Sequence, residues 1–128
     1  MTTIPLLKDA SIIVLNVFVK HKERQKKIRM ALDTGATYTI IPQEVAETLK
    51  LIPELTKKEK EIITASGTEK VPLVHLPIVR VGNAEAQQVK AIIHDLPSKS
   101  HVDGLLGLSF LKYFNVHLNF KEGNLKIN

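Results

Sequence analysis

Short apolar runs rich in β-branched residues follow one another along the chain, and turn-forming residues separate these runs. Val, Ile and Thr favour strands, whereas Gly, Pro, Asn and Asp favour turns. This pattern predicts a mostly β protein in which neighbouring strands pair as hairpins. We expect strands at residues 11–19, 27–32, 37–41, 61–65, 71–81, 89–94, 115–120 and 125–127.

Two segments have helical rather than strand character. Pro42 stands where a helix would begin, and Val45, Ala46 and Leu49 follow it at helical spacing. Residues 105–114 also place their apolar side chains at helical spacing. The sequence therefore predicts one or two short helices beside the strands.

The length fits one domain, residues 1–128, with a substantial core, because 44% of the residues are hydrophobic and 24% are charged. The chain contains no cysteine, so we expect neither a disulfide framework nor a thiolate metal site. No apolar run reaches the roughly 20 residues of a membrane span. Lys8 and Asp9 interrupt the first apolar stretch, where a signal peptide would lie. We therefore expect no membrane partner and a cytoplasmic location.

The formal net charge of +5 sits entirely in residues 20–29, which hold six basic residues and one acidic residue. Such a stretch can bind nucleic acid or a membrane surface. It can equally be the solvated tip of a hairpin between two strands. The four phenylalanines fit the core, which leaves no aromatic platform on which bases could stack. Nucleic acid is therefore not expected as a partner.

The tripeptide Asp33-Thr34-Gly35 carries the most chemical information. It directly follows an apolar strand, so it places a carboxylate on a turn whose glycine amide can approach closely. The threonine hydroxyl can brace such a turn. An ordinary β-turn is the alternative reading, because Asp, Thr and Gly all favour turns.

A second element lies some 70 residues later, in the sequence Val102-Asp103-Gly104-Leu105-Leu106-Gly107. With the earlier sequence Ala31-Leu32-Asp33-Thr34-Gly35-Ala36-Thr37, it resembles the retropepsin-like aspartic proteases, which are single-domain relatives of the pepsins. The resemblance extends over roughly residues 28–127, and it depends on the order and spacing of these elements. It implies a closed, barrel-like β fold.

The resemblance also implies a role for each matched residue. The loop Asp33-Thr34-Gly35 carries the catalytic carboxylate in this family, and Leu105, Leu106 and Gly107 support that loop. Residues 64–67 fall where the family has its flap, the β-hairpin that closes over substrate. The residues then expected to contact substrate are Leu32, Ala36, Ala65, Ser66 and Gly67.

Peptide hydrolysis of this type needs two carboxylates that share one proton, and the sequence holds one Asp-Thr/Ser-Gly triplet. The resemblance therefore implies a C2 homodimer in which each subunit supplies one Asp33. It also implies that Thr34 reaches across to the partner and that residues 125–127 join an intersubunit sheet. The expected activity is that of an aspartic endopeptidase on a polypeptide substrate. The alternative is a catalytically silent relative that serves as a dimerisation or peptide-binding module.

The histidines do not indicate a metal site. His94-Asp95 and His101-Val102-Asp103 place possible ligands close together, but their spacing matches no metal-binding motif. The six glycines are scattered and form no phosphate-binding loop. We expect neither a metal nor a cofactor.

Overall fold

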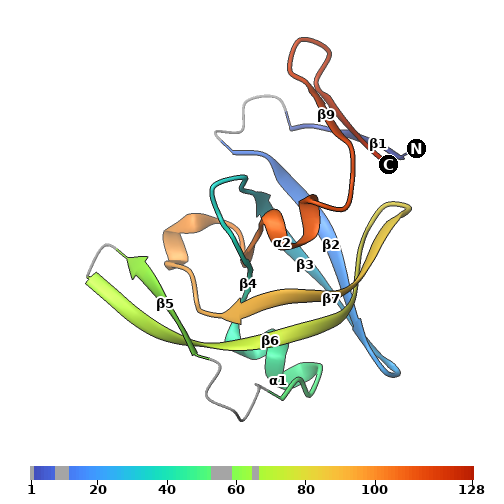
Figure 1. The fold of residues 1–128 in the computed structure, drawn as a ribbon. Helices are drawn as coiled ribbons and strands as arrows, with labels where there is room; N and C mark the ends of the chain where they lie inside the picture. Colours follow the sequence, from blue (N-terminus) through green and yellow to red (C-terminus); the bar gives the residue numbers. More distant parts are fainter. Residues whose placement is uncertain (1, 8–11, 53–58, 65–66) are drawn as a thin grey trace.

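The computed structural model describes residues 2–7, 12–52, 59–64 and 67–128, which form ten strands and two short α-helices (Figure 1). A single turn of 3-10 helix covers Ser98–Ser100. The elements in chain order are β1 (Thr2–Pro5), β2 (Val14–His21), β3 (Arg24–Leu32), β4 (Thr39–Ile41), α1 (Gln43–Thr48), β5 (Glu59–Thr64), β6 (Gly67–Val81), β7 (Ala84–Ile93), β8 (Gly104–Leu106), α2 (Leu108–Leu111), β9 (Val116–Asn119) and β10 (Asn124–Ile127).

Six of the strands close into a barrel, in the order β2-β3-β8-β4-β7-β6, because β6 also pairs with β2. The pairs β3–β8 and β4–β7 are parallel, and the other pairs are antiparallel. The first part of β6 extends beyond the barrel and pairs with β5 from Glu59↔Pro72 to Thr64↔Gly67. This long hairpin projects at the left of Figure 1. The predicted mostly β, barrel-like fold with two short helices is confirmed.

Strand alternation explains how the barrel fills its interior. Successive side chains of a strand point to opposite faces. Val17 and Val19 of β2 are buried, as are Ile28 and Met30 of β3, while Arg29 between them is exposed. Period-two burial of this kind is what the β-branched runs of the sequence predict.

The expected helix at residues 105–114 is wrong over its first part. Residues 104–106 form β8, in which Leu105 and Leu106 pair in parallel with Ala31 and Leu32 of β3. The helix is confined to α2. Helical spacing is a local signal, and here the pairing with a strand far away in the chain determines the conformation.

The hairpin expected at the basic stretch, residues 20–29, is present, but most of the stretch belongs to its strands and not to its tip. β2 and β3 pair as far as His21↔Arg24, so the turn consists of Lys22 and Glu23 alone. Lys22 adopts a positive φ of 56° in this tight turn. Most of the basic side chains therefore project from strands, and they are exposed there.

Two of the four phenylalanines lie outside the core, contrary to expectation. Phe120 is 71% exposed in the turn after β9. Phe18 is half-buried on the outer face of β2, with the Arg80 guanidinium 4.6 Å from its ring centroid. Phe110 and Phe114 do pack against each other, with ring centroids 4.8 Å apart.

A separate three-stranded sheet is formed by β1, β10 and β9, with β10 in the middle. Leu125 and Ile127 of β10 are buried against the barrel core. Figure 1 shows this sheet beyond α2, with both chain termini in it. Among the described residues, no helix is long and apolar enough to cross a membrane.

Candidate active site

Asp33 lies at the end of β3, and backbone hydrogen bonds hold it on both sides. The Leu32 amide donates to the carbonyl of Ile13 (2.8 Å), and the Asp33 amide donates to the carbonyl of Leu106 (3.0 Å). The Ala36 amide then donates to the carbonyl of Asp33 (3.2 Å), which closes a tight turn. The Asp33 side chain is half-buried, whereas Thr34 and Gly35 are exposed. The carboxylate is thus held on a fixed turn and remains accessible to a ligand.

Gly35 is placed against the carboxylate as the sequence predicts. Its amide donates to Oδ1 of Asp33 at 2.9 Å. A Cβ atom at position 35 would lie only 3.2 Å from the same oxygen, so a larger residue would crowd the carboxylate. Glycine at this position leaves room for the backbone amide to approach the carboxylate closely.

The segment after the turn supports the start of α2. The amide of Leu108 donates to the carbonyl of Ala36 (2.8 Å), and the amide of Ser109 donates to the carbonyl of Thr37 (3.0 Å). The first amides of a helix lack partners within the helix itself. Here the loop after Asp33 supplies those partners, so the loop and α2 hold each other in place.

A buried hydroxyl pair strengthens the same junction. Thr39 and Ser109 are the buried polar residues of the described chain, 0% and 7% exposed, and they lie 70 residues apart. The Thr39 amide donates to Ser109 Oγ (2.9 Å), the two hydroxyl oxygens lie 3.0 Å apart, and the Gly107 amide donates to Thr39 Oγ1 (3.3 Å). This pair is not predicted from the sequence. The available signal was a lone serine within the apolar segment that follows Gly107.

Ser109→Ala is expected to lower the free energy of unfolding by about 1–3 kcal/mol, because it leaves the buried Thr39 amide without its acceptor. Urea denaturation measures this loss. Ser98→Ala is the matched control, since Ser98 is exposed and should unfold like the wild type. Equal stability of the two variants would show that the buried hydroxyl pair does not stabilise the junction.

A second apolar cluster, distinct from the main core, lies between the barrel and the base of the β5–β6 hairpin. β8 sends neighbouring residues to different sides: Leu106 is buried in the main core, whereas the half-buried Leu105 packs on the second cluster. This second cluster consists of Ile40, Val71, Leu73 and Ile92, with Tyr38, Leu96 and Leu105 packed against it. It provides an apolar wall next to the strand end that holds Asp33.

The remaining predicted site residues lie in different parts of the structure. Leu32 is half-buried and packs against the main core, and Ala36 is half-buried in the loop. Gly67 is exposed at the start of β6, with φ of +123° and open space around its Cα. Ala65 and Ser66, expected at the flap tip, lie outside the described residues. At the predicted flap position, β5 and β6 do pair as an antiparallel hairpin.

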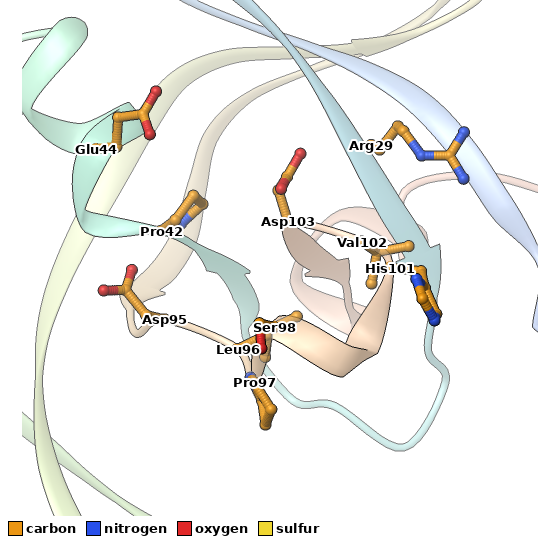
Figure 2. Close-up of a pocket in the computed structure, with 10 residues that line it drawn as sticks. All are labelled: Arg29, Pro42, Glu44, Asp95, Leu96, Pro97, Ser98, His101, Val102 and Asp103. Atoms are coloured by element: carbon orange, nitrogen blue, oxygen red, sulfur yellow. The ribbon is translucent and has the colours of Figure 1, made fainter.

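A polar pocket of about 500 Å³ adjoins the second cluster through Leu96. Figure 2 shows that its charged side chains come from separate segments of the chain: Arg29 from β3, Glu44 from α1, Asp95 from the segment after β7 and Asp103 from the residue before β8. Asp95 also accepts a hydrogen bond from the Gln43 amide through Oδ1 (2.9 Å). Asp33 is not among the lining residues, so this pocket is separate from the candidate site.

Possible metal ligands are not gathered into a site. Within residues 2–7, 12–52, 59–64 and 67–128, no group of three or more His, Cys, Asp or Glu side chains is placed to hold a metal ion. His101 and Asp103 line the polar pocket, whereas His94 does not.

The Asp33 turn and the segment that contacts it both lie within the match to a known protein family. The model of a family described as "gag-polyprotein putative aspartyl protease" matches residues 20–113, which include the turn at Asp33 and the segment at Gly107. The chain belongs to this aspartyl protease family. No curated protein matches the sequence.

The retropepsin-like character of the fold is supported by a solved structure, that of a retropepsin-like aspartic protease from Rickettsia conorii. The two chains superpose with a TM-score of 0.72 and are 28% identical. The match covers 99% of this chain and 89% of the Rickettsia chain. The small terminal sheet is thus part of the shared fold as well as the barrel.

Proposed function

We propose that this retropepsin-like protein is an aspartic endopeptidase that acts as a homodimer, with one Asp33 from each subunit in the active site. The observation that carries the proposal is the accessible Asp33 carboxylate, held on a turn by the Gly35 amide at 2.9 Å in a chain of the aspartyl protease family. Thr34 and Gly35 are the proposed companions of Asp33 in that loop, and Leu105, Leu106 and Gly107 are its proposed supports.

The proposed chemistry divides the work between the two carboxylates. One Asp33, ionised, takes a proton from a water molecule as that water attacks the peptide carbonyl carbon. The other Asp33, protonated, donates its proton to the carbonyl oxygen as negative charge develops there. In such a site the two carboxyl groups lie next to each other, so they share one proton and titrate as a pair. A single subunit holds one such loop, so it holds half of the machinery.

The surface around the loop is suited to a second copy of the chain. Ile12 is 41% exposed and precedes Ile13, whose carbonyl accepts a hydrogen bond from the Leu32 amide. Leu108 is 42% exposed, and its own amide donates to the carbonyl of Ala36 in the loop. A partner that covered these two side chains would remove apolar surface from water. In a C2 dimer joined on this side, both Asp33 turns would approach the symmetry axis.

The terminal sheet limits how such a dimer can be joined. Residues 125–127, predicted to join an intersubunit sheet, lie in β10, which already pairs with β1 and β9 of its own chain. The described part of this sheet leaves the outer edges of β1 and β9 for another strand. We therefore propose that any sheet continued between subunits is continued through β1 or β9.

Cleavage of a mixed peptide library at a series of protein concentrations tests the proposal. We expect cleavage, blocked by a statine-type mimic of the transition state, and we expect the activity per chain to fall on dilution as the dimer dissociates. Sedimentation at the same concentrations should report the dimer wherever the protein is active. A dimer that cleaves no peptide at any acidic or neutral pH would instead support a dimerisation or peptide-binding module.

A further inference from the structure

The basic stretch of residues 20–29 has no place in the proposed catalysis, yet it carries the whole net charge of the chain. Its turn lies at the start of β3, whereas Asp33 follows the end of that strand. A strand of this length spans roughly 30 Å at about 3.3 Å per residue. The basic turn is therefore remote from the candidate active site, and its surface needs a separate explanation.

The β2–β3 turn packs against the end of α1 rather than standing free in solvent. The carbonyl of Leu49 can only accept, so Nδ1 of His21 carries the proton of the 2.7 Å hydrogen bond between them. The turn and the helix end together enclose a groove of about 670 Å³. Figure 1 shows both elements at the bottom of the barrel, where the blue hairpin ends and α1 lies.

The groove combines positive charge with an apolar wall. Lys22, Arg24 and Lys50 line it and are exposed, against the single acidic residue Glu23. In the part of the chain that the structure describes, no carboxylate forms an ion pair with any of the three cations. Ile52 also lines the groove and is 77% exposed, the highest value among the described large apolar side chains.

These features favour a polypeptide over the other anionic partners. A site for single-stranded nucleic acid gains affinity from aromatic side chains that stack on bases, and no Phe, Tyr or Trp lines this groove. Binding to a membrane surface buries a broad apolar face, whereas Ile52 is the one exposed apolar side chain among the described residues that line this groove. Acidic groups in the occupant would complement the positive charge of the groove. An apolar side chain beside those groups would cover the exposed Ile52.

We propose that this groove binds a polypeptide segment of a partner protein that contains acidic residues and an apolar anchor side chain. The carboxylates of the segment pair with Lys22, Arg24 and Lys50, and its anchor covers Ile52. Because the groove is remote from Asp33, the proposal does not depend on catalytic activity. Asp33→Asn protein should bind such a segment as tightly as wild-type protein does.

Fluorescence anisotropy with a labelled peptide of alternating Glu and Leu tests the proposal on intact protein. We expect the peptide to bind at low ionic strength and to bind more weakly as salt shortens the range of the charges. K22E/R24E should weaken binding about tenfold or more, since it removes two attractions and adds two repulsions. I52S should weaken binding about tenfold through the lost apolar contact. A peptide of alternating Glu and Ser should bind as weakly as I52S binds the first peptide.

The control variant K90E/K121E makes the same change in net charge at exposed lysines that do not line the groove. It should bind the Glu-Leu peptide within about twofold of wild type, because it changes the net charge of the protein but not the charge of the groove. Equal weakening by both double variants would overturn the proposal, as would absence of binding at low salt. Tighter binding of a single-stranded oligonucleotide or of phosphatidylserine vesicles, lost in K22E/R24E, would overturn it in favour of that partner.

Discussion

Asp33→Asn is expected to abolish peptide hydrolysis while leaving the fold in place. In a homodimer the one substitution removes both carboxylates of the active site, and neither amide can act as general acid or base. Proton transfer by a positioned group contributes roughly 10²–10⁴-fold to a rate, so the loss of both transfers should reduce kcat by about 10⁴-fold or more. Initial rates on a peptide that the wild type cleaves measure the loss.

The fold should survive because the asparagine amide oxygen can still accept the hydrogen bond that the Gly35 amide now gives to Oδ1. The melting temperature and the sedimentation coefficient should therefore match those of the wild type. Asp103→Asn is the matched control. Asp103 likewise adjoins a strand of the site, since it directly precedes β8, but it is exposed and lines the polar pocket instead of the Asp33 turn. This control should retain most of its activity.

Mixing the inactive and active chains tests whether the site is shared between subunits. If subunits exchange freely, adding an equal amount of Asp33→Asn protein should reduce the total activity of the wild type to about half, and excess should reduce it toward zero. A site complete within one chain would keep its full activity in every mixture. That result, with Asp33→Asn itself inactive, would retain Asp33 as catalytic and refute the shared site.

The sequence is most informative where local rules and tertiary structure agree. The Asp33 turn follows from residue types alone, because Asp and Gly favour turns and a glycine leaves room for its amide beside the carboxylate. Strands such as β2 and β3 follow from their alternation of buried and exposed side chains. In both places the determining interactions lie within a few residues of one another.

The prediction fails where contacts distant in sequence decide the conformation. Leu105 and Leu106 have helical spacing with the residues that follow, but pairing with Ala31 and Leu32 makes them a strand. Nothing in the neighbouring sequence indicates that Leu105 and Leu106 pack against different apolar clusters. The Thr39–Ser109 hydrogen bonds join residues 70 positions apart, so no pattern within a window of the sequence reveals them.

Gly107→Ala is expected to disrupt both the stability and the candidate active site, because position 107 has no room for a side chain. A Cβ atom there would lie 2.6 Å from the Ala36 carbonyl oxygen and 2.7 Å from that of Tyr38. These are backbone atoms of the loop after Asp33, and they cannot rotate aside as a flexible side chain would. Either the loop or the start of α2 must move, and each is bonded to the other.

We expect the substitution to cost about 3 kcal/mol or more, the upper range for overpacking in a dense interior, and to lower the melting temperature by roughly 10 °C. Displacement of the loop by about 1 Å should in addition reduce kcat on the order of 100-fold in the protein that remains folded. Gly123→Ala is the control, since Gly123 has open space around it and a φ of +74°. The control should lose only about 1–2 kcal/mol through its backbone conformation and should keep its kcat. A Gly107→Ala protein with control-like stability and full activity would mean that the contact between Gly107 and the loop does not position Asp33.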